Sequence, residues 1–280
     1  MKLLVTGAAG MLGHALTTAA SWRGHDVHAA SRSVLDVTDA GAARRLLDRV
    51  RPAAVLHCAA FTQVDAAEAQ PDRAFAINAE GAATMARACA VVDARFVYPS
   101  TDYVFDGQAT RPYRPSDRTA PINVYGHSKL AGEEAARSAP LHLIVRTSWL
   151  YGACGRKFVS TMLKGARAGG SLRVVGDQLG SPTWTRDLAN TLISLLERDT
   201  PSGVYHASNQ GKATWYDLAC ATFEFAGIDA TVERVGSAEF PRPAKRPAFS
   251  VLDCTTTEAI VGPLRPWRDA LQEALAYGVE

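Results

Sequence analysis

The chain has 280 residues, of which 47% are hydrophobic and 21% are charged, as is ordinary for a globular protein. Its formal net charge of +2 gives no reason to expect a nucleic acid or a membrane surface as partner. The five cysteines form no CxxC pair, so we expect free thiols in a reducing compartment. No apolar run reaches the roughly 20 residues that span a bilayer, and Gly7 interrupts the first one before it resembles a signal peptide. We therefore expect a cytoplasmic protein.

Short apolar runs alternate with longer helical patterns in the first half of the chain. The runs are almost continuously hydrophobic, which is typical of strands in a parallel sheet that is covered on both faces. The repeated strand–helix unit predicts an α/β protein with a Rossmann-type, doubly wound parallel sheet. We expect strands at 2–6, 26–30, 54–58, 95–99 and 142–147, and helices at about 11–22, 40–50, 72–91 and 123–138.

Gly7, Gly10 and Gly13 form a Gly-x-x-Gly-x-x-Gly motif between the first strand and the first helix. A sharp turn and a close approach to a pyrophosphate both require residues that lack Cβ. The helix N-terminus then offers free N–H groups and the positive end of its dipole to the phosphates. A strand–helix turn without a ligand is the alternative, but the strand–loop–helix context favours a dinucleotide site.

After Trp149 the pattern changes to helices joined by loops that contain glycine and proline. Residues 204–207 could return to the main sheet, whereas residues 240–252 hold too many prolines for a regular element. We expect a dinucleotide-binding domain at 1–150, with a return segment near 203–228. A smaller C-terminal substrate-binding lobe is expected to comprise 151–202 and 229–280. Its helices are expected near 157–168, 186–198, 214–226 and 267–278.

The end of the second strand carries Ser31-Arg32, where an NAD enzyme usually has a carboxylate that binds the ribose 2′-hydroxyl. An arginine favours a 2′-phosphate through charge-assisted hydrogen bonds. We therefore expect NADPH as cofactor, with NADH possible. The alternative is that Arg32 is a solvated surface residue. Asp36 and Val37 follow closely and are expected to flank the adenine.

Tyr125-Gly-His-Ser-Lys129 places a tyrosine and a lysine four residues apart, on one face of a predicted helix. A nearby ammonium is expected to lower the phenol pKa from about 10, so that Tyr125 can give a proton to a carbonyl oxygen. Lys129 could also bind the nicotinamide ribose. Alone, this spacing also fits an exposed helix face. Ser100-Thr101 strengthens the catalytic interpretation because it ends the fourth strand, where the active crevice of such sheets lies. The alternative role for that pair is to cap a turn.

Eight segments together make the chain resemble the dTDP-4-dehydrorhamnose reductase family, which includes dTDP-dihydrostreptose synthase-like members. They are VTGAAGMLG from Val5, VDAAE from Val64, INAEGA from Ile77, STDYVFDG from Ser100, PINVYGHSKLAGE from Pro121, RTSWLYG from Arg146, DQLGSPT from Asp177 and RPAKRPAFSVLD from Arg242. The resemblance implies NADPH-dependent reduction of the C4 ketone of dTDP-6-deoxy-L-lyxo-4-hexulose to dTDP-L-rhamnose.

The resemblance also implies roles for individual residues. The catalytic residues would be Thr101, Tyr125 and Lys129. Ser100 and the last two of these would also contact the cofactor, with Gly7, Gly10, Met11, Leu12, Gly13, Asp36, Val37, Ala59, Ala60 and Thr62. The sugar would lie near Val64, Tyr103 and Trp149. Its diphosphate could meet Arg242, Lys245 or Arg246, for which the alternative is a solvated basic loop.

Other activities are less well supported by the residues. Related 4,6-dehydratases have Thr-Asp-Glu where this chain has Thr101-Asp102-Tyr103, so the second carboxylate needed for elimination is missing. Epimerases need tightly held NAD, whereas Arg32 favours exchangeable NADPH. Ala15 replaces the first interface glutamate with which some bacterial members bind Mg²⁺, so we expect no metal, although a homodimer is possible. Two alternatives stay open: reduction of another dTDP-4-keto sugar, such as a dihydrostreptose precursor, or a non-catalytic NADP-binding regulatory subunit.

Overall fold

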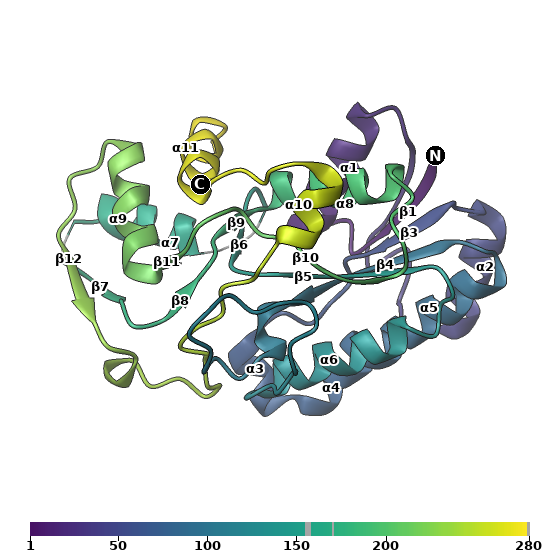
Figure 1. Cartoon of the computed structure of the whole chain (residues 1–280), viewed down its shortest axis with the longest axis horizontal. Helices are drawn as coiled ribbons and strands as arrows, with labels where there is room; N and C mark the ends of the chain where they lie inside the picture. The colour runs from purple at the N-terminus through teal and green to yellow at the C-terminus, as the bar shows by residue number, and fades with distance from the viewer. Residues whose placement is uncertain (155–157, 170, 279–280) are drawn as a thin grey trace.

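Six parallel strands form the central sheet (Figure 1). The computed structural model describes residues 1–154, 158–169 and 171–278. Across the sheet the strand order is β10-β5-β4-β3-β1-β2, and every adjacent pair is parallel. The strands are β1 Lys2–Thr6, β2 Asp26–Ala30, β3 Ala54–His57, β4 Arg95–Thr101, β5 His142–Thr147 and β10 Gly203–His206. The predicted doubly wound parallel sheet is therefore confirmed, as is the return of residues 204–207 to it.

Helices cover both faces of this sheet (Figure 1). On one face pack α1 (Met11–Trp22) and α8 (Thr185–Glu197), and on the other pack α2 (Ala40–Val50), α5 (Gly81–Val91) and α6 (Val124–Ala136).

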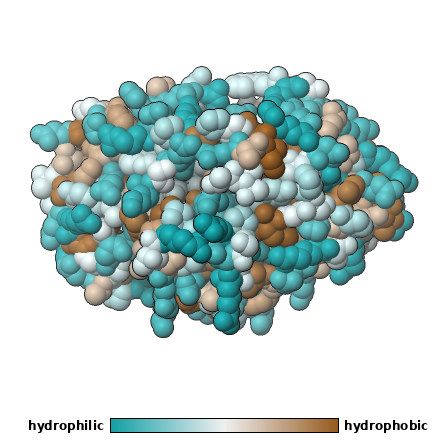
Figure 2. All heavy atoms as spheres, viewed as in Figure 1, coloured by the Kyte–Doolittle hydropathy of each residue, from teal (hydrophilic) through white to brown (hydrophobic). Residues whose placement is uncertain are grey.

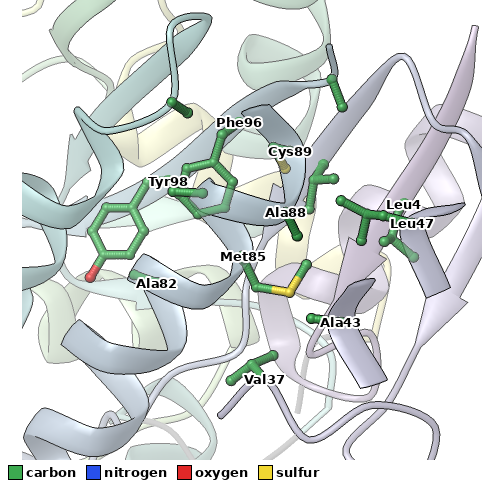
Figure 3. Close-up of a cluster of buried hydrophobic side chains, with 14 of the residues drawn as sticks. Leu4, Val37, Ala43, Leu47, Ala82, Met85, Ala88, Cys89, Phe96 and Tyr98 are labelled. Atoms are coloured by element: carbon green, nitrogen blue, oxygen red, sulfur yellow. The ribbon is translucent and has the colours of Figure 1, made fainter. Parts of the chain in front are cut away.

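Figure 3 shows part of the hydrophobic core between the sheet and the second group of helices, where Leu4 and Phe96 from the strands meet Leu47 from α2 and Met85 from α5. Burying each such side chain contributes about 1.5–3 kcal/mol. Because both faces are covered, the strands consist of hydrophobic residues almost throughout.

The direction of winding reverses at β1, which lies between β2 and β3. In doubly wound sheets, ligands bind at the carboxyl ends of the strands at such a reversal. The glycine motif follows β1, and residues 58–62 follow β3. The topology therefore brings these two segments to the expected crevice.

The C-terminal lobe lies beyond one end of the sheet (Figure 1). Its helices α7 (Phe158–Arg167), α9 (Trp215–Ala226) and α11 (Trp267–Ala276) share a core with Tyr151 and Trp184. Three short strand pairs complete it, namely β7 (Leu172–Val175) with β12 (Val232–Val235), β8 (Leu179–Gly180) with β11 (Ala213–Thr214), and β6 (Leu150–Tyr151) with β9 (Thr183–Trp184).

Two helices do not pack with the part of the chain to which the predicted domain boundaries assign them. Helix α8 falls in the segment assigned to the lobe, but its leucines join the sheet core beside α1. Helix α9 falls in the predicted return segment, but it packs with α7 and α11. The reason is the crossover to β10: a parallel connection needs a helix against the sheet, and α8 directly precedes β10.

Several boundaries also differ from the predictions. The helix expected at 72–91 consists of α4 (Pro71–Phe75), a π-helical turn at Ala76–Glu80 and α5. The short helices α3 (Val64–Ala69) and α10 (Thr255–Val261) were not predicted. Residues 240–252 contain no helix and no extended strand, as expected from their prolines.

On the face shown in Figure 2, hydrophilic residues predominate and hydrophobic ones lie in small, separate groups. The large apolar side chains are instead found mainly in the cores described above. Within the described residues, no helix is both long and apolar enough to cross a bilayer.

Candidate active site

The glycine motif forms a tight loop that leaves no room for a side chain at Gly7 or at Gly13. Gly7 has a φ of +61°, and a Cβ on it would lie 2.6 Å from the backbone nitrogen of Ala59. A Cβ on Gly13 would lie 2.3 Å from the carbonyl oxygen of Gly7. Gly10 is the N-cap of α1 and provides no capping side chain, so the first N–H groups of this helix are available to a ligand. The predicted steric need for glycine is confirmed at Gly7 and Gly13, whereas the approach of a pyrophosphate to the loop stays a prediction.

One cavity of about 390 Å³ extends from this loop to the carboxyl ends of β3 and β4. It brings together residues that lie far apart in the sequence, from the glycine motif to the lobe. Of the predicted site residues, it is lined by Gly10, Met11, Leu12, Gly13, Ala60, Thr62, Val64, Ser100, Thr101, Tyr103, Tyr125, Lys129 and Trp149.

The other predicted site residues lie outside this cavity. Gly7 and Ala59 contact each other beneath the loop. Val37 packs in the hydrophobic core, while Arg32 and Asp36 are exposed. Hydrogen bonds from Thr38 hold the pKa of Asp36 below its ordinary value, and the charge of Arg32 adds to this effect.

Arg242, Lys245 and Arg246 line a second cavity, of about 270 Å³. Tyr103 links the two cavities, because it lines the first one and its phenol is hydrogen-bonded with Arg246, which lines the second. The structure thus places the three basic side chains beside the main cavity and not inside it.

Tyr125 is the second residue of α6, and its ring is almost completely buried, at 9% exposure. The N-cap residue Asn123 fixes the start of the helix, since its Oδ1 accepts a 2.7 Å hydrogen bond from Gly126 N. Burial raises the pKa of Tyr125, and hydrogen bonding with Thr101 only partly opposes this effect. The predicted lowering of the phenol pKa by Lys129 is therefore wrong for the protein alone, because desolvation of a phenolate outweighs the neighbouring groups. Tyr125 is protonated at neutral pH, as a proton donor must be.

Lys129 lies one turn further along α6, with an exposure of 3%. Its Nζ donates a 2.8 Å hydrogen bond to Pro99 O and lies 3.9 Å from the ring centroid of Tyr98. Burial lowers the pKa of Lys129 to about 7, although Glu133 opposes this effect. A buried amine that titrates near neutral pH in a cavity is a candidate for a functional role.

Thr101 ends β4, where its hydroxyl caps the following turn and also lines the cavity, so that its catalytic role stays a prediction. Its Oγ1 accepts a 3.2 Å hydrogen bond from Tyr103 N, and so caps the short 3-10 turn that follows. The same hydroxyl lines the cavity and donates a 3.0 Å hydrogen bond to Asp102. Ser100, by contrast, donates a 2.6 Å hydrogen bond to buried Glu133, which Arg146 neutralises through two bonds of 2.8 Å.

The cavity is also lined by residues that were not predicted as site residues, and three of these have side chains suited to a role in the site: Asp102, His57 and Trp215. Asp102 is 2% exposed, and burial raises its pKa to about 6. His57 is held by Thr6, at 3.0 Å from Nδ1 to Oγ1.

The third unpredicted residue, Trp215, stacks on Trp149 with the ring centroids 3.6 Å apart and 3° between the planes. The capping box of Thr214 and Asp217 marks the start of α9 in the sequence, but it does not reveal that Trp215 faces Trp149.

Trp149 is also constrained by its backbone, since its φ of 47° lies in the left-handed region. Gly180 leaves space for its indole, because a Cβ there would lie 2.4 Å from Trp149 Cε2. The indole of Trp149 is thereby held between Gly180 and Trp215, where it lines the cavity. Among the described residues, no three His, Cys, Asp or Glu side chains are grouped so that they could hold a metal ion.

Comparison with known proteins places this site in a family. A family model described as the RmlD substrate binding domain matches residues 1–279. The dTDP-4-dehydrorhamnose reductase of Mycolicibacterium smegmatis is 46% identical over 281 residues, which cover 98% of this chain and 85% of that protein.

Two crystal structures extend the comparison to three dimensions. A dTDP-4-dehydrorhamnose reductase from Clostridium acetobutylicum has a TM-score of 0.96 and 39% identity, with 99% of each chain covered. The enzyme of that name from Bacillus anthracis, in complex with NADP, has a TM-score of 0.95 and 36% identity, again with 99% of each chain covered. Since the family model and these relatives span nearly the whole chain, the chain belongs to the dTDP-4-dehydrorhamnose reductase family.

Proposed function

We propose that the protein is an NADPH-dependent oxidoreductase that reduces the C4 ketone of dTDP-6-deoxy-L-lyxo-4-hexulose to dTDP-L-rhamnose. The observation that carries this proposal is the presence of Thr101, Tyr125 and Lys129 in the same cavity as the glycine loop. The names of the relatives agree with it. A non-catalytic regulatory subunit would not need a buried hydroxyl, phenol and amine on one cavity wall.

The residues present fit a dinucleotide. The loop from Gly7 to Gly13 leaves a cradle that Cβ atoms would fill, and the uncapped start of α1 suits a pyrophosphate. Arg32 is exposed at the end of β2, where it would meet a 2′-phosphate, in line with the NADP complex of the Bacillus anthracis relative. When bound, NADPH supplies the hydride that reduces the ketone carbon.

Three side chains, those of Tyr125, Thr101 and Lys129, carry out the proton transfer to the ketone oxygen. Tyr125 donates its phenolic proton to the ketone oxygen, so that the carbonyl becomes an alcohol when hydride arrives at carbon. In the structure the proton of the Thr101 hydroxyl is donated to Asp102 Oδ1. When substrate binds, this hydroxyl turns to donate its hydrogen bond to the ketone oxygen and holds that oxygen near the phenol. Lys129, when charged, stabilises the phenolate that remains on Tyr125.

The substrate is assigned to the side of the cavity that faces the lobe. Val64, Tyr103 and Trp149 surround the sugar, and Arg242 and Arg246 meet the diphosphate, because guanidinium groups suit phosphate oxygens. The presence of a tyrosine at position 103 supports reduction over dehydration. The division into a cofactor part at 1–150 and a lobe that supplies substrate contacts belongs to the same proposal. All five cysteines are free, which supports a cytoplasmic location.

The direct test is consumption of NADPH by the purified protein with dTDP-6-deoxy-L-lyxo-4-hexulose, followed by absorbance. Stoichiometric oxidation of NADPH and formation of dTDP-L-rhamnose, identified by NMR, are expected. Turnover with a dihydrostreptose precursor alone would change the assigned sugar. NADPH binding without oxidation by any dTDP-4-keto sugar would contradict the enzymatic proposal.

A further inference from the structure

Three segments meet beside Tyr125: helix α3, the start of α6, and the arginine loop, by which we mean residues 242–246. The arginine loop comes from the C-terminal part of the chain, whereas the two helices come from the cofactor part. Helix α3 and the start of α6 share an apolar cluster, and polar contacts join both of them to the arginine loop.

Asp65 on α3 binds the arginine loop at three points. Its carboxylate accepts hydrogen bonds of 2.6 and 2.9 Å from the two terminal nitrogens of Arg246. It also accepts from Arg242 Nη1 at 3.4 Å and from Ala244 N at 3.3 Å. The paired bonds to Arg246 fix the plane of its guanidinium as well as its position.

The environment makes this ion pair stronger than an ordinary surface pair. Only 18% of the Arg246 side chain and 30% of the Asp65 side chain are exposed. The hydrogen bond from Arg246 is the main cause that lowers the pKa of Asp65. Without this carboxylate, three cationic side chains, Arg242, Lys245 and Arg246, would lie around one cavity, and Arg246 would keep only its bonds to Ala244 O and Tyr103 among those described.

Two further contacts connect α3 and the arginine loop to α6, the helix that carries Tyr125. Glu68, one turn after Asp65, accepts a 2.9 Å hydrogen bond from the first N–H of α6, that of Val124. Asn123, the N-cap of α6, donates a 2.8 Å hydrogen bond to Lys245 O. The three segments therefore form a closed ring of contacts, and Tyr125 lies in the first turn of the helix that the ring anchors.

We infer that Asp65 is a positioning residue, which orients Arg246 for the diphosphate of the substrate and joins the arginine loop to the helix that carries Tyr125. This inference rests on the proposed function, because it assigns the diphosphate to the arginine loop. Asp65 itself touches neither the reacting atoms nor the anion. Its effect is transmitted through the geometry of Arg246.

The experiment compares Asp65→Asn and Asp65→Glu with the wild type, using dTDP as the probe in calorimetric titrations. Losing a charged, paired hydrogen bond commonly weakens an interaction by about tenfold or more. We expect Asp65→Asn to raise the Kd for dTDP and the KM for the keto sugar by about tenfold, with kcat lowered by less than about threefold. Asp65→Glu restores the charge and should recover most of the dTDP affinity. The Kd for NADPH should stay within about twofold in both variants.

Asp48→Asn is the matched control, because Asp48 also pairs with an arginine, Arg44, at 2.8 Å, but on the exposed surface of α2. It should leave all these constants unchanged. In an Arg246→Met background, Asp65→Asn should have little further effect, since the group that it positions is gone. This double variant also serves as an independent test if Asp65→Asn alone folds poorly.

Unchanged or tighter dTDP binding by Asp65→Asn would overturn the inference. So would an equal loss of NADPH affinity and thermal stability, because that result would show a merely structural role. Titration with dTDP needs no turnover, so it can fail or succeed independently of the proposed reduction. If the wild type binds dTDP but reduces no keto sugar, the proposed function fails while the role of Asp65 is still measured.

Discussion

One side of the cavity, here called the sheet side, is formed by Thr101 at the end of β4 and by Tyr125 and Lys129 on α6. These residues are 5%, 9% and 3% exposed. On the lobe side, the arginine loop has no regular structure, and the side chains of Arg242 and Arg246 are 60% and 18% exposed. The first group is positioned by backbone elements within the protein core. The second is positioned mainly by a single carboxylate, that of Asp65.

This difference suggests how the two sides contribute to catalysis. Buried groups on rigid elements are preorganised, so they can stabilise a transition state without rearranging. A loop that is ordered by ion pairs can adapt to the diphosphate and release it. We therefore expect changes on the sheet side to lower kcat, and changes on the lobe side mainly to raise KM.

The largest effect is expected for Tyr125→Phe, which removes the proton donor but keeps the ring and its edge-to-face contact with Tyr103. Loss of a general acid should lower kcat by about a thousandfold, while the Kd for NADPH and the melting temperature change little. Steady-state kinetics and fluorescence titration measure these quantities. Tyr205→Phe is the control, because the Tyr205 hydroxyl donates a hydrogen bond to Pro201 O at the sheet edge, away from the cavity. Retention of most of the activity in Tyr125→Phe would exclude the proposed acid.

Lys129→Met should lower kcat by about a hundredfold and yet stabilise the fold. Burial lowers the pKa of Lys129 from 10.5 to about 7 in the folded protein. Below about pH 7 the folded protein therefore bears the full cost of a buried charge, and this cost disappears as the pH rises toward the unfolded pKa.

The variant should accordingly gain about 3 kcal/mol at about pH 6, and much less at about pH 9, after the lost bond to Pro99 is subtracted. Denaturant unfolding at the two pH values checks this. A gain that is independent of pH would show that the amine is not the group responsible.

Arg32→Ala tests the cofactor preference, because Arg32 is exposed just after β2, where the 2′-phosphate is proposed to bind. Removing a charge-assisted bond to the 2′-phosphate should reduce the preference for NADPH over NADH by about 10–100-fold. The comparison of kcat/KM with the two cofactors measures it, with Arg44→Ala on α2 as a surface control. If the wild type has equal kcat/KM values with NADPH and NADH, Arg32 does not determine the choice of cofactor.

The smallest effect is expected for Trp215→Leu on the lobe side. The stack with Trp149 is worth about 0.5–1.5 kcal/mol beyond burial, so KM for the keto sugar should rise about three- to tenfold while kcat stays within about twofold. Trp22→Leu is the control, since Trp22 is 73% exposed on α1. A large fall in kcat instead would mean that the lobe also orients the reacting groups.

The sequence predicted the sheet side better than the lobe side, for physical reasons. Near-continuous apolar runs define the parallel strands, and the functions of Gly7 and Gly13 follow from steric rules that are local. Because parallel strands bring their carboxyl ends to one edge, Thr101 could be expected near the helix whose first turn contains Tyr125.

Features that depend on distant partners were not predictable in this way. The π-helical turn at Ala76–Glu80 accompanies the hydrogen bonds of Asn78 with both backbone groups of Phe61, 17 residues earlier. The bond between Asp65 and Arg246 joins residues 181 positions apart. The direction of the Tyr125 pKa shift depends on total burial, which no local pattern reports.

The central claim is that hydride passes from NADPH to C4 of the dTDP-keto sugar, while Tyr125 supplies the proton to oxygen. The most direct test uses NADPH that carries deuterium at the transferable position of nicotinamide C4, with the product examined by NMR. We expect one deuterium at C4 of the dTDP-L-rhamnose formed by the wild type, and almost no product from Tyr125→Phe. Product without deuterium at C4, or labelled product formed at the wild-type rate by Tyr125→Phe, would contradict this claim.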